Sequence, residues 1–136
     1  MRLVHGVAAT ALTLGVAGGA TGYEPRVNYA LHCMGCHHAD GAGDDGRVPS
    51  IRHTLVHFSA SPEGRNFVMR VPGVAQAPLS DAEIAALLNW MARNLSDMSV
   101  PDGFVNYTAD EVARERHRPL IDVRAARERL LAGAAE

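Results

Sequence analysis

Residues 32–41 read HCMGCHHADG and contain both cysteines of the chain. Cys33 and Cys36 lie three positions apart, and His37 follows the second cysteine directly. Two thiols and an imidazole at this spacing can do three kinds of chemistry. They can form a redox-active disulfide, provide half of a zinc site, or attach a haem covalently.

The surrounding sequence favours the haem. A disulfide between Cys33 and Cys36 would close a very small loop and constrain little of the unfolded chain. A thioredoxin-type site would require a βαβ pattern, and a structural zinc ion usually takes four ligands; no second cysteine pair is present, although His37 or His38 could add to the thiols. Cys-x-x-Cys-His is the attachment pattern of c-type haem: the thiols bond two vinyl groups on one porphyrin edge, and the histidine binds the iron.

The first 22 residues predict a cleavable secretory signal. Arg2 is followed by an apolar stretch from Gly6 to Ala17, and small residues continue to Gly22. A membrane anchor is the alternative, but a spanning helix needs roughly 20 apolar residues and this stretch is shorter and rich in glycine. We therefore expect a protein exported to a bacterial periplasm, cleaved near Ala20 or Gly22, with no stable membrane association afterwards.

The composition gives little support to nucleic-acid binding. The formal net charge is −2, all 13 basic residues are arginines, and no basic run occurs. A length of 136 residues suits one domain with one hydrophobic core. Aromatic residues make up only 5%, so either small aliphatic side chains or a large flat cofactor must fill the centre.

The elements that position the motif are predicted to be helices. A first helix at 26–34 carries Cys33, and the glycine-rich run 41–46 must be a turn or loop. A short segment at 51–58, a helix at 63–71 and a loop at 72–78 follow. The strongest pattern, at 80–95, has a capping box of Ser80 with Glu83 and an apolar face at helical spacing.

Two shorter helices are predicted beyond residue 102. Thr108 with Glu111 suggests a second capping box for a helix that reaches about His117. Asp122 is expected to cap a last helix, which Gly133 can end. Nothing in the sequence predicts a confident strand, so the fold class is all-α.

With these motifs the chain resembles the class I c-type cytochromes from about Tyr23 to Leu95. The resemblance implies helices packed around one haem c, attached through Cys33 and Cys36, with His37 as an iron ligand. It also implies that the carbonyl of Pro49 accepts a hydrogen bond from Nδ1 of His37, and that Trp90 packs across the first helix. The implied organisation is a signal at 1–22, a cytochrome domain at 23–101 and a helical extension at 102–136.

The second axial ligand departs from the family pattern. The family's methionine usually stands before a proline in the loop that precedes the last helix, where this chain has Val71. Met69 is the first candidate by position, and Met91 and Met98 come next. His53 or His57 would give ligation by two histidines, and an iron with no sixth protein ligand also remains open.

The resemblance implies a carrier of single electrons, not an enzyme. Such a carrier requires no catalytic acid, base or nucleophile, and the sequence contains no convincing set of them. The expected partners are redox proteins: a periplasmic dehydrogenase as donor, and an oxidase or another cytochrome as acceptor. One alternative is a haem enzyme or gas sensor with an open distal site. Another is a fixed cytochrome subunit of a dehydrogenase complex, docked through the extension at 102–136. Arg52, Arg65 and Arg70 are candidate partners for the haem propionates.

Overall fold

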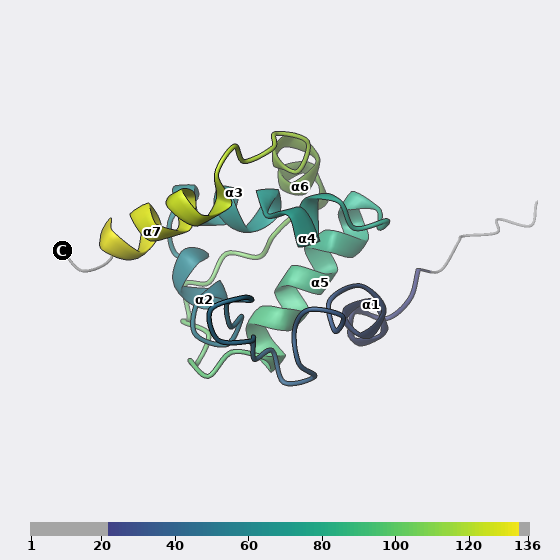
Figure 1. Cartoon of the computed structure of the whole chain (residues 1–136). Helices are drawn as coiled ribbons and strands as arrows, with labels where there is room; N and C mark the ends of the chain where they lie inside the picture. The colour runs from purple at the N-terminus through teal and green to yellow at the C-terminus, as the bar shows by residue number, and fades with distance from the viewer. Residues whose placement is uncertain (1–21, 134–136) are drawn as a thin grey trace, which may run out of the picture.

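The structure is a computed structural model that describes residues 22–133 (Figure 1). The predicted signal lies almost wholly outside the described residues. The helices are α1 (Pro25–His32), α2 (Leu55–Phe58), α3 (Pro62–Arg70), α4 (Pro72–Ala75), α5 (Asp81–Asn94), α6 (Ala109–Glu115) and α7 (Val123–Gly133).

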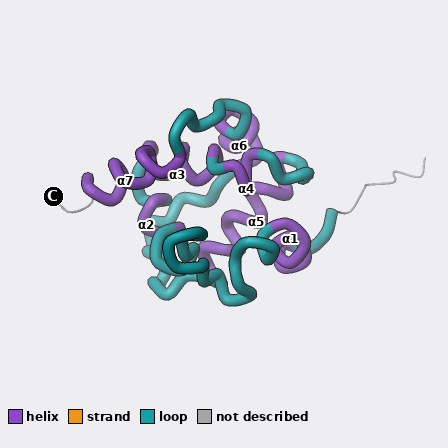
Figure 2. Tube along the Cα trace, in the orientation of Figure 1, coloured by secondary structure: helices purple, strands orange, loops and turns teal. Residues whose placement is uncertain are grey.

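The all-α prediction is confirmed for residues 22–133, which contain helices and loops but no strand (Figure 2). One local prediction was wrong: residues 72–75 form a helical turn, α4, and not a loop. Pro72 at its first position explains the difference, since the fixed φ of proline suits a first helical turn and the missing N–H is not needed there. None of the described helices is long and apolar enough to cross a membrane.

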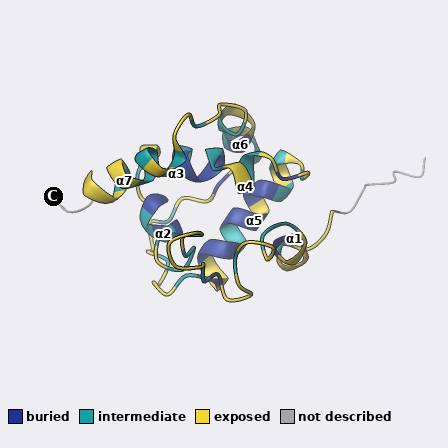
Figure 3. Cartoon of the chain, in the orientation of Figure 1, coloured by how far each residue is buried: buried dark blue, intermediate teal, exposed yellow. Residues whose placement is uncertain are grey.

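Helix α5 is the centre of the molecule (Figure 3). It contacts α1, α2 and α6, and its buried face includes Ile84, Leu87, Leu88 and Met91. The predicted capping box is present: the Ser80 side chain accepts a hydrogen bond from the Glu83 N–H, and the Glu83 carboxylate accepts one from the Ser80 N–H. Sequence and structure therefore agree on where the main scaffold helix begins.

Helix α1 is fixed to α5 by two aromatic rings. The ring centroids of Tyr29 and Trp90 lie 5.7 Å apart at a tilted angle. Tyr29 is buried, and its hydroxyl donates a 2.6 Å hydrogen bond to the carbonyl of His38, beyond the end of α1. Trp90 packs across the first helix, as predicted, and this contact determines where α1 delivers the residues that follow it.

The segment after residue 102 is part of the main core. Tyr107 and Val112 are buried among the core residues, and the Tyr107 and Ser59 hydroxyls are hydrogen-bonded at 2.7 Å. Helices α3 and α6 are joined by Arg65, which binds both carboxylate oxygens of Glu111 at 2.8 and 2.7 Å. The predicted second capping box is therefore only half formed: Thr108 accepts from the Glu111 N–H, but the Glu111 carboxylate is taken by Arg65.

The ion pair between Arg65 and Glu111 gives a test of this packing. The Arg65 guanidinium holds the pKa of Glu111 below its usual range. The stabilisation is then fully present above the pKa of the unfolded carboxyl and is lost as the pH falls through the lower, folded pKa. We expect Glu111→Gln to lower the free energy of unfolding by about 2 kcal/mol at neutral pH, because one partner of a largely buried pair is removed.

Urea unfolding at about pH 7 and about pH 3 measures this effect. The difference between the wild type and Glu111→Gln should shrink at the acid pH. Asp110→Asn is the matched control, because Asp110 is an exposed carboxylate in the same helical turn. Equal losses in the two variants at neutral pH would contradict the assigned role of Glu111.

Candidate haem site

A tight turn after α1 carries both cysteines and His37. The Cys33 N–H bonds to the Tyr29 carbonyl, and the N–H groups of Cys36 and His37 bond to the Cys33 carbonyl at 3.1 and 2.9 Å. The backbone from Cys33 to His37 thus continues as a helical turn, which gathers the two thiols and the imidazole beside one another. The cysteines are free, so the structure contains no disulfide between them.

The environment of the turn sets the protonation of its side chains. Burial, and then the neighbouring Cys36, raise the pKa of Cys33 to about 11, so this thiol is protonated at neutral pH. Burial and the neighbouring His38 lower the pKa of His37. The imidazole is therefore held in its neutral form, which is the form that binds a metal.

Cys33, Cys36 and His37 line one large cavity, with a volume of about 490 Å³. Its walls come from His32 at the end of α1, from α2, α3, α4, α5 and α7, and from loop residues that include 47–51. The lining is largely apolar and includes Ile51, Leu55, Phe58, Phe67, Val68 and Leu87. A cavity of this kind suits a bulky, flat, mostly apolar group held at the Cys33–His37 edge.

Nδ1 of His37 is buried and has no hydrogen-bond partner among the described residues. Pro49 lines the same cavity, but the expected bond from Nδ1 to its carbonyl is not formed in this structure. An imidazole that presents one nitrogen to a metal usually donates its other N–H to such a carbonyl. Pro49 therefore remains the predicted acceptor, close to the site but not bonded to His37.

Comparison with known proteins decides the family. The chain is 30% identical over 115 residues to cytochrome c-552 of Thermus thermophilus, an alignment that covers 71% of this chain and 88% of that protein. A second cytochrome c-552, from a particular strain of the same species, is also 30% identical, with 78% of its length covered. The chain belongs to the c-type cytochromes. No protein-family model matches it.

The cofactor of this cytochrome is haem c, and the structure fits it. The two cysteines and His37 stand at one edge of an apolar cavity, and the buried Nδ1 of His37 lacks a partner. When bound, the haem supplies an iron that gains and loses one electron. No group of three or more His, Cys, Asp or Glu side chains suited to a metal ion occurs within residues 22–133, so the geometry does not offer the zinc alternative a complete ligand set there.

The structure does not bring Met69 to the site. Met69 is completely buried on α3, but the cavity-lining residues of that helix are Phe67 and Val68. Met69 belongs to the buried core but is not among the residues that line the cavity. Met91 on α5 does line the cavity and is 5% exposed. In the sequence, Met91 is one residue of the apolar face at 80–95. Its spacing is the same for an iron ligand and for a side chain that only packs in the core, so the sequence could not distinguish the two roles.

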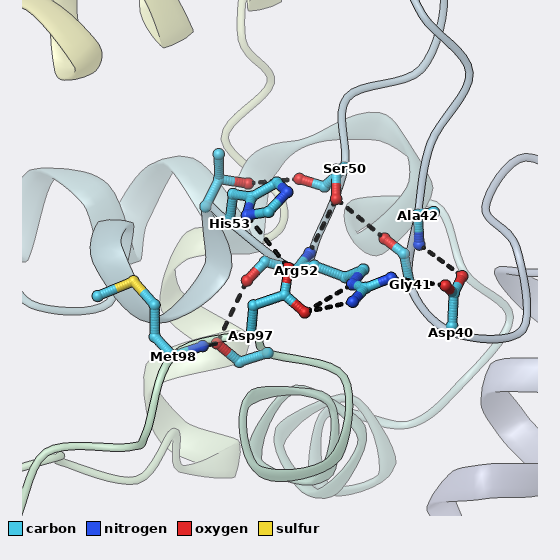
Figure 4. A network of polar contacts seen from close by, with 10 residues as sticks. Asp40, Gly41, Ala42, Ser50, Arg52, His53, Asp97 and Met98 are labelled. Atoms are coloured by element: carbon cyan, nitrogen blue, oxygen red, sulfur yellow. Dashed lines mark hydrogen bonds and ion pairs between the residues drawn. The ribbon is translucent and has the colours of Figure 1, made fainter.

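Met98 and the two candidate histidines also lie away from the cavity lining. Met98 is 48% exposed, and Figure 4 shows its side chain pointing away from the surrounding polar network. Nδ1 of His53 lies 3.2 Å from a carboxylate oxygen of Asp97, at the surface. His57 packs against the ring of Phe58, at 5.7 Å between centroids. Neither histidine lines the cavity.

The arginines proposed for the propionates have other partners. Arg52 binds Asp40 at 2.7 Å and Asp97 at 2.8 Å, joining the loop after the motif to the end of α5 (Figure 4). Arg65 binds Glu111, and Arg70 donates to the carbonyls of Arg118 and Pro119. The arginines that line the cavity are instead Arg47 and Arg127. Only the folded chain brings them there, since Arg127 stands in the extension far from the motif.

Trp90 is not one of the residues that line the cavity. It lies on α5, and its ring packs against that of Tyr29 at 5.7 Å between centroids. The structure therefore gives Trp90 the role of holding α1, and through α1 the Cys33–His37 turn, against the scaffold.

Substitution of the cysteines tests the site. We expect Cys33→Ser and Cys36→Ser each to leave one thioether bond, and the double variant to carry no covalent haem, because each thiol forms one bond. Haem staining after denaturing electrophoresis measures covalent attachment. Met34→Leu is the control, since Met34 is an exposed residue between the cysteines that keeps both thiols. Covalent haem in the double variant would contradict the assignment.

Proposed function

We propose that this protein is an exported class I cytochrome with one haem, which carries single electrons between redox proteins. The observation that carries the proposal is the shared apolar cavity of Cys33, Cys36 and His37. An apolar surrounding excludes water and limits the reorganisation that accompanies a change of charge. The proposed donor is a periplasmic dehydrogenase, and the proposed acceptor is an oxidase or another cytochrome.

The residues of this chain have three tasks in that function. Cys33 and Cys36 tether the cofactor at the end of α1, and neutral His37 offers one nitrogen to the iron. Helices α3 and α5 exclude water with apolar side chains. Cys36 is exposed, so the tethered edge lies near the surface, where a partner can approach for electron transfer.

The direct test of the carrier function is a redox titration followed by the visible spectrum. We expect the purified exported protein to contain one covalent haem per chain and to titrate reversibly as a single one-electron couple. Alternating additions of a chemical reductant and oxidant should cycle the spectrum without loss. A centre that cannot be re-oxidised, or that consumes the oxidant catalytically, would contradict a simple carrier.

The sixth ligand gives a second test. Among the described methionines only Met91 lines the cavity, so we propose Met91 as the distal ligand in place of Met69. We expect Met91→Ala to give a high-spin ferric spectrum and to bind carbon monoxide when reduced, because the coordination position becomes open. Met69→Ala should destabilise the fold but keep the wild-type spectrum, since its side chain only packs in the core.

A second candidate function has one observation in its favour. Val71 stands where the family's methionine is usual, and the cavity wall around it is formed by Phe67, Val68 and Val74; none of these side chains can bind iron. A haem protein with an open distal site would have such an apolar wall. Carbon monoxide binding by the reduced wild type would favour this candidate and contradict ligation by Met91. Val71→Met, which restores the family's pattern, should then abolish that binding.

A further inference from the structure

Helix α7 lies beside the haem cavity. It contacts α3 (Figure 1), and Val123, Ala126 and Leu130 form a partly buried stripe against the core. These residues recur at intervals of three and four, which places them on one face of a helix. The extension therefore has a defined inner face.

Two residues of that inner face, Val123 and Arg127, line the cavity that also contains Cys33, Cys36 and His37. The wall of the site is thus completed by a helix from the far end of the chain. Arg127 is half-buried, whereas Arg124 and Arg129 of the same helix are exposed. Of the three arginines of α7, only Arg127 therefore places its positive charge at the cavity.

The charges around the cavity are of one sign. Arg47 and Arg127 contribute guanidinium groups, and no aspartate or glutamate is among the lining residues. Arg127 makes no ion pair or side-chain hydrogen bond with any residue in 22–133, although three other partly buried arginines, Arg65, Arg70 and Arg116, all do. A half-buried cation without a partner costs free energy, so an anion bound beside Arg127 would stabilise this site.

We propose that the haem site extends onto α7 and that Arg127 binds a propionate carboxylate of the haem. The inference rests on the haem attachment described above. The propionates are the anionic groups of haem c, and the planar guanidinium matches a carboxylate with two parallel hydrogen bonds. The extension is then a wall of the redox site. The position of α7 in the fold determines how close the Arg127 charge lies to the iron.

The proposal predicts the sign of a change in midpoint potential. The ferric haem carries one more positive charge than the ferrous haem, so a nearby cation favours the ferrous form. Removing the Arg127 charge should lower the potential. The propionate that loses its partner should also have a raised pKa, and the potential should then depend more strongly on pH near neutrality.

The experiment compares Arg127→Gln with Arg124→Gln in the full-length holoprotein. Arg124→Gln makes the same charge change on the exposed side of α7 and is the matched control. Spectroelectrochemical titration should show that Arg127→Gln shifts the reduction equilibrium about tenfold toward the oxidised form, about 59 mV for a one-electron couple. The control should move it by much less. Equal shifts in the two variants, or no shift in either, would overturn the proposal.

Two further measurements keep the test decisive. The haem content of each variant, measured as the pyridine haemochrome, reports attachment and the carrier function separately from the role of Arg127. Where Arg127→Gln yields no holoprotein, Arg127→Lys and Arg124→Lys replace the pair. A lowered potential in Arg127→Lys alone supports a carboxylate that needs the two-pronged guanidinium, and identical potentials overturn it.

Discussion

Tyr29 makes the contact on which the arrangement of the site depends. Its ring packs on Trp90 of α5, and its hydroxyl bonds to the carbonyl of His38, just after the Cys33–His37 turn. Burial raises the pKa of this hydroxyl to about 12, so it remains a donor at all ordinary pH values. One side chain thus joins the first helix, the scaffold helix and the residue that follows the motif, and it holds the Cys33–His37 turn between two fixed points.

The rest of the fold supports this arrangement by fastening separate segments to α5 and α3. The Arg52 network holds the loop after the motif against the end of α5. At the other end of α5, Arg116 donates hydrogen bonds to the carbonyls of Leu79 and Ala77, just before that helix begins. These charged hydrogen bonds fasten loops to the scaffold through backbone carbonyls and carboxylates at the edge of the core.

The sequence predicted the features that depend on local patterns. The capping box of Ser80 and Glu83, the apolar face of α5 and the helical class all follow from residues three or four positions apart. The haem motif is likewise a local pattern. Local patterns do not reveal which side of a helix faces a cavity. Met69 and Met91 look alike in the sequence, and only the packing of α3 and α5 separates them.

Long-range charge pairing was equally hidden from the sequence. Glu111 stands at the third position of a capping box, where its carboxylate is expected to accept a hydrogen bond from the Thr108 N–H. Arg65, on a helix more than forty residues earlier, binds that carboxylate instead. The partners of the arginines that the sequence offered for the propionates were hidden for the same reason. Arg52 and Arg65 are close to the motif in sequence but are taken by acidic side chains, whereas Arg127 is distant in sequence and lines the cavity.

The cavity has a consequence for how the chain folds. Its walls include His32 at the end of the first helix and Arg127 in the last, so the site is complete only when both ends of the domain have come together. Contacts between such distant positions form late, because the entropy of closing a long loop must be offset first. A haem attached through Cys33 and Cys36 stays on the chain when the protein unfolds, but only the closed cavity covers it with apolar side chains. The attached cofactor therefore stabilises the native state through contacts with every helix that forms the wall.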